Sequence, residues 1–451
     1  MTTGPARPGP WLFQVPTSTD GRGDDADELC RAIAANGDPR GLTALGLLLV
    51  DGPGPSDGDL RRGVELFETA AGLDEMVANL RLGVARLEGA GTAADRAGAL
   101  ACFERAAELG SSEGARRAGA LRWSGGGEAV DSEQAEQCWR RAIAIDDHPG
   151  AMLELAAAMT ARAAYVDAVG VAIRAAHVTR RRLEEPDVDR RWSTLVGARS
   201  AASREQLAHW LEAAMDLVNQ HRVEVYDAAE EDDPAACFEW GRITSLGFGD
   251  VPDPDEGRTW LERSAASGHA AALHALAQSD RRAGDTERFE ARLRAAAELG
   301  HPSAVHDLGY ALYTGAFGGE PDIEGAAAAY RAIAGPEHPS TATDLSFVLE
   351  EVPGDDAASE SVRWLEVAAG ADDVAAMRRL GERLRDGDGV DRDLAAAARW
   401  FLGAYYLGWD EAVEIVQDFL ADVEPGDVAE ADRLADGTGD AASRLLTPPA
   451  A

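Results

Sequence analysis

Small and bulky apolar residues return along this chain at a nearly constant spacing. A leucine-glycine pair, or a variant with another small residue in second place, recurs every 32 to 37 residues within two blocks. A pair of bulky residues, such as Leu66-Phe67 or Trp400-Phe401, follows about 20 residues behind it. Two patterns with the same spacing predict an array of repeats, each with two helices. The first residues of the small pairs are Leu45, Leu82, Ala118, Leu155, Trp240, Leu276, Leu308, Leu345 and Leu380.

An aspartate stands seven residues before the bulky pair in most repeats. Aspartate directly ahead of an apolar-periodic run is typical of a helix N-cap, because its side chain accepts hydrogen bonds from the first free backbone N–H groups. Glycine-rich loops come just before these positions. Each repeat is therefore expected to consist of a first helix, a glycine-rich turn, a capped second helix and a short turn. The predicted caps are Asp59, Asp95, Asp131, Asp253, Asp285, Asp322 and Asp393.

The small residue on the first helix has a packing role. Glycine or alanine there lets the second helix approach closely, while the bulky pair fills the adjacent space. One repeat cannot bury its apolar face alone, so repeats are expected to stack into a solenoid.

This pattern resembles the Sel-one-like repeat family, short relatives of the tetratricopeptide repeat. Residues 375–408 are the best-matching repeat, and the resemblance covers roughly residues 37–172 and 235–420. It implies an all-α fold, a right-handed αα superhelix of about eight to ten repeats of about 36 residues. It also implies a role as an adaptor or scaffold for protein complexes.

The spacing divides the chain into five segments. Residues 1–23 are rich in proline and glycine and are expected to be disordered, although Trp11 to Phe13 could instead dock on the first repeat or on a partner. Residues 24–172 form a first repeat block, 173–234 a divergent helical insertion, 235–420 a second block and 421–451 a C-terminal cap and tail. Within the insertion, a long helix from Ser203 to Glu230 is expected, with Ser203 as its cap.

A cluster of arginines precedes that long helix in a strongly acidic chain. Two interpretations remain open: a solvated helix end, where arginine is favoured, or a contact with a partner or another domain. The candidate partner-binding residues are Arg180, Arg181, Arg182, Arg190 and Arg191.

The chain has 43 basic and 80 acidic side chains in 451 residues, for a net charge of -37. This acidity argues against nucleic-acid binding, which needs a basic face. It favours basic partners or simply solubility. The chain contains no apolar run of membrane-spanning length, and four cysteines are too sparse for a disulfide framework, so a cytoplasmic protein without membrane contact is expected.

No segment carries a recognisable catalytic, cofactor or metal site. The glycine-rich loops lack the lysine of a phosphate-binding loop, because every basic residue is arginine. The loop after Asp386 lacks two calcium ligands. The recurring histidines His148, His269, His301 and His338 fall in turns and are expected on the surface. The nearest approaches to a catalytic pair are His306-Asp307 and His209 with Glu212, but neither has a nucleophile beside it. The sequence predicts no catalytic residue, no cofactor and no metal.

The resulting prediction is a non-catalytic scaffold that binds a protein or peptide partner along a groove formed by successive first helices, with basic partners favoured by the acidic charge. Such binding is expected to weaken with salt. Two alternatives remain: a hydrolase acting within the groove, and an acidic mimic that regulates a nucleic-acid enzyme. The second requires the negative charge to line one continuous face.

Overall fold

The computed structural model describes residues 39–51, 55–125, 131–184, 204–248, 250–371 and 373–394, with residues 396, 397, 400, 401 and 404. Four predictions lie outside these residues: Arg190 and Arg191, the cap Ser203, residues 1–23 and residues 421–451. The described residues contain eighteen helices and no strand, as an all-α repeat fold requires.

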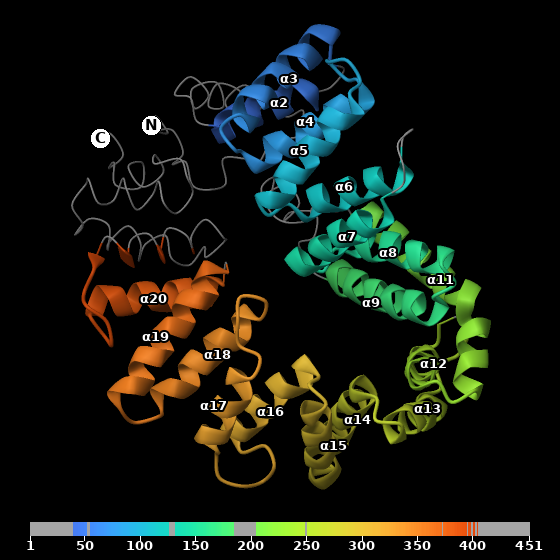
Figure 1. The fold of residues 1–451 in the computed structure, drawn as a ribbon, viewed down its shortest axis with the longest axis vertical. Helices are drawn as coiled ribbons and strands as arrows, with labels where there is room; N and C mark the ends of the chain where they lie inside the picture. Colours follow the sequence, from blue (N-terminus) through green and yellow to red (C-terminus); the bar gives the residue numbers. More distant parts are fainter. Residues whose placement is uncertain are drawn as a thin grey trace, which may run out of the picture. The chain divides into compact units, whose positions relative to one another are not determined.

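The helices alternate between two layers (Figure 1). The first helices of the repeats, here the A helices, are α2 (Pro39–Val50), α4 (Met76–Glu88), α6 (Ser112–Ser124), α8 (Pro149–Ala161), α12 (Pro234–Leu246), α14 (Ala270–Ala283), α16 (Pro302–Thr314), α18 (Pro339–Glu350) and α20 (Val374–Asp386). The second, the B helices, are α3 (Asp57–Ala71), α5 (Arg96–Glu108), α7 (Ser132–Asp146), α9 (Tyr165–Glu184), α13 (Pro254–Ala266), α15 (Thr286–Glu298), α17 (Ile323–Arg331) and α19 (Asp355–Gly370). A further helix, α11 (Arg204–Glu230), is 27 residues long.

The chain divides into two compact units. The N-terminal unit contains the described residues up to 231 together with residues 242–254. The C-terminal unit contains residues 232–241 and the described residues from 255 onward.

Within the residues that the structure describes, five repeats are closed by a glycine of the A helix packed against an aromatic ring of the B helix. A Cβ added at Gly83 would lie 2.6 Å from the ring of Phe103, and one at Gly309 would lie 2.7 Å from the ring of Tyr330. These distances are far shorter than any real carbon contact, so only glycine allows the two helices to come this close. Phe103 and Tyr330 are both almost fully buried. The same contact joins Gly46 to Phe67, Gly119 to Trp139 and Gly381 to Phe401.

Aspartate side chains cap several B helices. Asp95 accepts a hydrogen bond from the N–H of Gly98 at 2.9 Å, and the aspartates before α7, α15 and α17 make the equivalent bond. Asp393 accepts from the N–H of Ala396 at 2.9 Å, and Asp253 directly precedes α13.

The prediction for Asp59 is wrong. Ser56 is the N-cap of α3, and Asp59 occupies the third helical position, where its carboxylate accepts from Ser56 N at 2.9 Å. The two residues form a capping box, which satisfies two otherwise free backbone donors reciprocally. Two carboxylates, Asp57 and Asp59, follow the serine, and the hydroxyl takes the capping position.

The insertion differs from its predicted boundary. Helix α9 runs unbroken from residue 165 to 184, so the boundary expected at 172/173 falls inside a helix. Helix α11 packs along α9 and buries one stripe of its own surface at a helical spacing. That stripe consists of Leu207, Trp210, Ala214, Val218, His221, Val225 and Ala229.

None of the helices in the described part of the chain is both long and apolar enough to cross a bilayer.

Candidate functional site

Polar side chains bridge neighbouring A helices in a fixed register. The first residue of the bridge stands two places before the leucine-glycine pair of one A helix. Its partner stands one place before the leucine-glycine pair of the next A helix. His274 Nε2 thus lies 2.7 Å from Asp307 Oδ2, and His306 Nε2 lies 2.9 Å from Asp344 Oδ2. In the N-terminal unit Arg116 and Glu154 make the same bridge. One rule of position therefore produces all three bridges.

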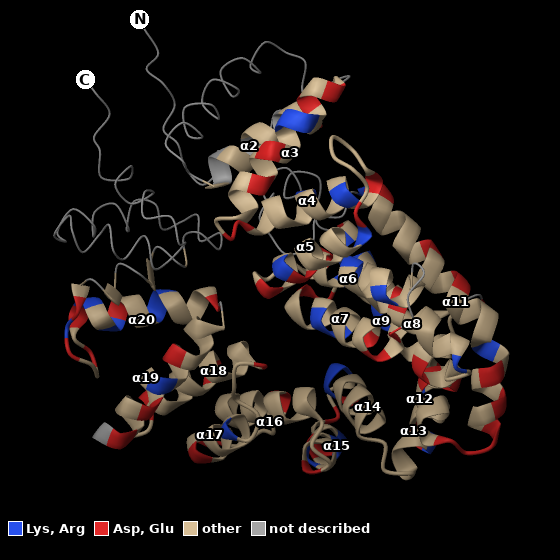
Figure 2. Ribbon diagram, turned by 45° about the horizontal axis from the view of Figure 1, so that its top comes forward, with Lys and Arg blue, Asp and Glu red and all other residues tan. Residues whose placement is uncertain are grey.

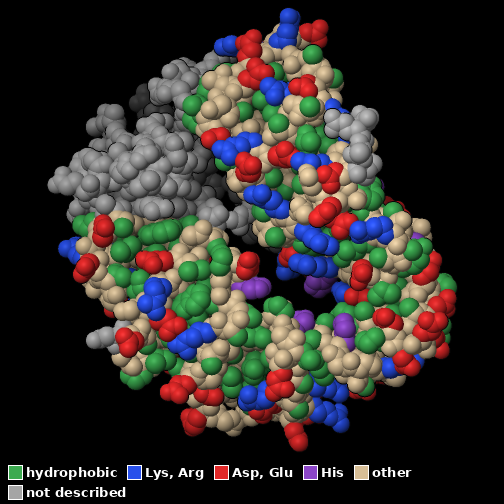
Figure 3. Space-filling view, viewed as in Figure 1, with side chains coloured by type: hydrophobic (Ala, Val, Ile, Leu, Met, Phe, Trp, Pro, Cys, Tyr) green, Lys and Arg blue, Asp and Glu red, His purple; other side chains and the backbone are tan. Residues whose placement is uncertain are grey.

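In the C-terminal unit the bridges join α14, α16 and α18 into a ladder of histidine and aspartate. These helices follow one another along the inner side of the arc that α13 to α20 form, and histidines gather at this edge (Figures 1 and 3). Asp307 also accepts a hydrogen bond from Gln278 of α14, and it faces the second ring nitrogen of His306 at 3.8 Å. His306 therefore lies between two carboxylates, Asp307 on its own helix and Asp344 on the next.

The two carboxylates stabilise the charged form of the ring. Asp307 and Asp344 together raise the pKa of His306 to about 9. Burial favours the neutral form of Asp307, but contacts with His274 and His306 outweigh it and hold the pKa of this carboxyl well below its usual range. At neutral pH the ladder thus contains a charged imidazolium held by two carboxylates.

A second polar bridge lies further along α16. The hydroxyl of Tyr313 donates to Glu351 at 2.6 Å, just beyond the end of α18. Between the two bridges, one turn from His306, stands Tyr310, whose side chain is 53% exposed. Tyrosine is enriched among the residues that dominate protein interfaces, so this ring is a candidate contact for a partner.

The N-terminal unit builds a more enclosed network at the corresponding place. Glu113, at the start of α6, accepts from Arg116 Nε at 2.7 Å and from Arg117 Nε at 2.6 Å. His148 donates to the same carboxylate through Nε2 at 3.1 Å, because its Nδ1 accepts the backbone N–H of Ala151. Burial of Glu113 opposes ionisation, but the hydrogen bonds from Arg116 and His148 hold its pKa well below its usual range. This network is a packed junction rather than an open surface.

The expectation that the turn histidines lie on the surface is wrong for His148. Its side chain is 1% exposed, because it caps α8 and its ring packs 5.2 Å from that of Trp210 on α11. A Cβ added at Gly150 would lie 2.8 Å from the same indole, so the insertion is fitted tightly onto α8. His301 caps α16 in the same way and is half-buried.

The candidate arginines at the end of α9 have different surroundings. Arg180 and Arg181 are exposed. Arg182 is half-buried, donates to the backbone oxygen of Asp146 and lies 3.9 Å from its carboxylate, so it braces α9 against the end of α7. Within the described part of this cluster, only Arg180 and Arg181 remain candidates for contact with a partner.

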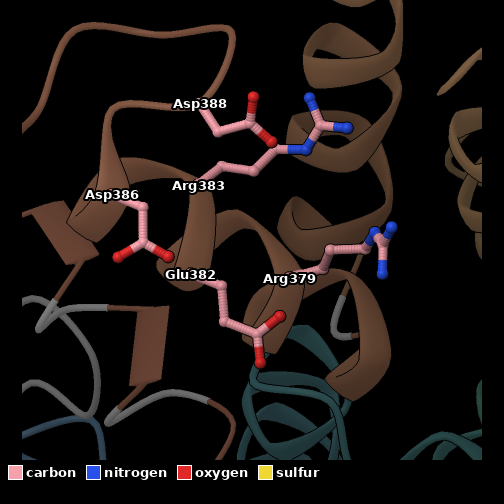
Figure 4. Close-up of a pocket in the computed structure, with 5 residues that line it drawn as sticks. All are labelled: Arg379, Glu382, Arg383, Asp386 and Asp388. Carbon is pink, nitrogen blue, oxygen red and sulfur yellow. The ribbon is translucent and has the colours of Figure 1, made fainter.

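A shallow hollow of about 180 Å³ lies at the end of α20 (Figure 4). Arg379 and Arg383 extend toward the same side of the helix, and both pair with Glu350 of α18. Arg379 also stacks on the ring of Phe347, with its guanidinium carbon 4.1 Å from the ring centre. The arginines are thus already engaged within the protein. The hollow is lined by Arg379, Glu382, Arg383, Asp386 and Asp388.

The acidic charge does not line the A helices continuously. Helices α4, α6, α14 and α20 each contain more arginines than acidic residues, whereas α16 and α18 contain acidic residues and no arginine. Figure 2 shows blue and red segments alternating along the described helices. Among the A helices, α8, α16 and α18 thus carry acidic residues without an arginine.

The sequence analysis singled out His306 and Asp307 as a neighbouring pair and gave them no catalytic role, because no nucleophile stands beside them. In the structure the shorter contacts run between helices, to Asp344 and His274. The hydrogen bonds of His274 and His306 go to carboxylates and to Gln278, not to a serine, threonine or cysteine. No cluster of metal-ligating side chains occurs among the residues described. Aligning the repeats would have placed His274, His306 and Arg116 at one equivalent position, but it would not have shown which residue of the next A helix each of them meets.

A family model described as Sel1 repeat matches residues 39–74, 77–111, 112–147, 234–269, 302–330 and 374–409. Residues 270–301 and 331–373 lie outside these matches, although they form the same helix pairs, α14–α15 and α18–α19.

Among solved structures, the chain is similar to a protective antigen of uropathogenic Escherichia coli strains that displays an SLR fold. The identity is 21% over 98% of this chain and 93% of that chain, with a TM-score of 0.40. It is also similar to a Sel1 repeat protein from Oxalobacter formigenes, with 18% identity over 93% of this chain and 97% of that chain and a TM-score of 0.28. No curated protein matches the chain.

Proposed function

Because this chain is a Sel1-repeat protein, and such repeats are generally protein-interaction scaffolds, we propose that it is a non-catalytic adaptor. Its binding surface, here called the A face, is the surface formed by the A helices α14, α16 and α18, where it holds a segment of a partner protein. The observation that carries this proposal is the half-exposed Tyr310, which lies on α16 between His306 and Tyr313, the two residues that bridge α16 to Asp344 and Glu351.

The chemistry of this face favours a basic partner. Asp344 is 42% exposed and Asp307 31% exposed, so both can attract a cation without being fully removed from water. Ion pairs at such partly exposed positions are screened by salt, so binding weakens as ionic strength rises. The adaptor is proposed to act in the cytoplasm, in keeping with its sparse cysteines; Cys102 and Cys138 are free thiols.

The test is affinity capture followed by mapping. The full chain is immobilised, lysate of the native host is passed over it at low and at high salt, and the bound proteins are identified by mass spectrometry. The expected result is stoichiometric recovery of one protein at low salt and its loss at high salt.

The recovered protein is then purified and added back during hydrogen-deuterium exchange. Protection is expected in peptides from α14, α16 and α18, with peptides from α15, α17 and α19 as the internal control. Recovery of no protein at either salt, or protection confined to the B helices, contradicts the proposal.

A further inference from the structure

Tyr310 and Phe347 occupy equivalent positions in successive repeats. Each stands two residues after the leucine that opens the small pair, Leu308 on α16 and Leu345 on α18. A residue at this position faces a residue of the next A helix. That residue stands one place before the leucine that opens the small pair of the next repeat. Gln278 shows the same register on α14, because its Nε2 reaches Asp307 of α16.

At Phe347 this register brings an arginine over the ring. Arg379 of α20 lies 4.1 Å from the ring centre and is held there by Glu350. The protein uses the same contact elsewhere: Arg263 lies over Trp260 at 4.8 Å and Arg294 over Phe317 at 5.4 Å. Arginine on an aromatic face is thus a recurrent internal contact here, and it is stabilised by the attraction of the cation to the ring.

At Tyr310 the equivalent residue is Asp344, an acid in place of the arginine. Among the described residues no arginine lies over the Tyr310 ring. Tyr310 and Asp344 both lie near the buried Tyr330, since each raises its pKa. The ring thus lacks its stacking cation, and a carboxylate stands where that cation is found one repeat later.

Asp344 also has an acceptor oxygen to spare. Its equivalent Asp307 is engaged by His274, Gln278 and His306, whereas the hydrogen bond to Asp344 comes from His306 through Oδ2. The position from which Gln278 reaches Asp307 is taken, one repeat later, by Tyr310. An exposed ring and a half-engaged carboxylate therefore lie side by side.

We propose that an arginine side chain from the partner protein stacks on Tyr310 and pairs with Asp344, in the place that Arg379 takes on Phe347. This inference rests on the proposed function and names the chemistry of the partner at that surface. The planar guanidinium satisfies both groups at once, with a flat face for the ring and an edge of N–H donors for the carboxylate. Lysine has neither a flat face nor a fork of donors, so it satisfies the pair less well.

The local charge permits a further cation. His306 contributes one positive charge, against the three negative charges of Asp307, Asp344 and Glu351. Helices α16 and α18 carry no arginine to occupy the site themselves. An arginine from outside therefore meets an excess of negative charge beside an exposed aromatic face.

The experiment measures peptide binding to the full-length chain by fluorescence anisotropy. The probe is a labelled hexapeptide, Ala-Arg-Ala-Ala-Arg-Ala, compared with its lysine counterpart, in about 150 mM salt to screen long-range attraction. Wild type is expected to bind the arginine peptide more tightly than the lysine one. The variant Tyr310→Ala is expected to weaken arginine binding about fivefold, and Tyr310→Phe to change it by less than about twofold.

Two further variants sharpen the result. Asp344→Arg places an internal arginine where Arg379 stands one repeat later, so it is expected to fill the site and weaken the peptide at least about tenfold. Tyr226→Ala is the matched control, a 39% exposed tyrosine on α11 in the other unit, and it is expected to bind like wild type. Thermal melting followed by circular dichroism checks that every variant is folded.

Three outcomes overturn the inference: no binding of the arginine peptide to wild type, equal binding of the lysine peptide, or equal loss in Tyr310→Ala and Tyr226→Ala. Its failure is distinguishable from failure of the adaptor function. If wild type captures a partner from lysate and Tyr310→Ala captures it equally, the adaptor function is supported and the proposed arginine site is rejected. If no partner is captured but the peptide binds as described, the arginine site is supported and the adaptor function is rejected.

Discussion

Helices α6 and α8 of the N-terminal unit are bridged by Arg116 and Glu154, whereas α16 and α18 of the C-terminal unit are bridged at the same repeat positions by His306 and Asp344. The first bridge is enclosed, with Arg116 17% exposed, and its guanidinium is charged at every accessible pH. The second is twice as exposed on the cationic side, with His306 at 33%, and its cation titrates. The repeat position thus determines where a bridge forms. The residue types determine whether that bridge is a buried ion pair of constant charge or a more exposed one whose charge depends on pH.

The largest expected effect is the removal of Glu113 from the enclosed network. Glu113→Ala leaves Arg116 and His148 buried without their shared acceptor, so the free energy of unfolding should fall by about 3 kcal/mol. Chemical denaturation measures it. The matched control is Glu65→Ala, which breaks an ion pair with Arg62 whose side chains are 61% and 65% exposed, and which should cost less than about 0.5 kcal/mol. Similar losses in both variants would mean that enclosure does not distinguish the two networks.

A smaller effect is expected at the centre of the ladder. Asp307→Asn keeps the shape of the side chain but removes the charge that His274, Gln278 and His306 share. The free energy of unfolding should fall by about 1 to 2 kcal/mol, as for other hydrogen bonds to charged groups. Hydrogen exchange should report the loss in α14, α16 and α18 and leave α6 and α8 unchanged; loss spread evenly over both units would argue against a local ladder.

The two bridges should also respond differently to alkaline pH. The groups around His306 are Asp307 and Asp344, with Tyr330 on α17. Since the folded pKa of about 9 lies above the ordinary value of 6.5, this histidine stabilises the fold fully below about pH 6.5, and the contribution is lost as pH rises through 9. Exchange in α16 and α18 should quicken over this window, after correction for the intrinsic rate, while that of α6 and α8 stays flat. An NMR titration of the His306 ring with a midpoint near 6.5 would contradict this.

The smallest change is the most discriminating. His306→Arg gives the C-terminal bridge the same basic residue as the N-terminal one, so stability at neutral pH should stay within about 0.5 kcal/mol. The alkaline loss of protection in α16 and α18 should disappear, because arginine does not titrate in this range. Persistence of that loss in the variant would assign it to a group other than His306.

The helix pairs were predictable from the sequence because a small residue on the A helix and a bulky residue on the B helix recur about 20 residues apart. Gly83 with Phe103 and Gly309 with Tyr330 are local contacts, set by one turn and two helices. The caps follow for the same reason, and Asp59 departs from the pattern because Ser56, three residues earlier, is the N-cap and Asp59 completes a capping box with it.

The bridges were not predictable from the period alone. Which side chains of neighbouring A helices meet depends on how far each repeat is shifted and rotated against the next, and the spacing of 32 to 37 residues does not specify this. The burial of His148 likewise depends on Trp210, more than sixty residues away on an insertion outside the repeat pattern. Contacts within a repeat can be derived from the sequence, while contacts between repeats need the structure.

The glycine-aromatic contact also bears on how such a chain can grow. Both partners always belong to one repeat, as Gly46 and Phe67 or Gly381 and Phe401 do. A gene segment that encodes one whole repeat can therefore be duplicated or deleted without separating any ring from its glycine. Such an event changes the side-chain pairs between the two repeats that become neighbours, where Arg116, His274 or His306 would contact a different residue. The chain can thus change its length with its helix pairs intact and acquire a new pattern of charge on the A face in the same step.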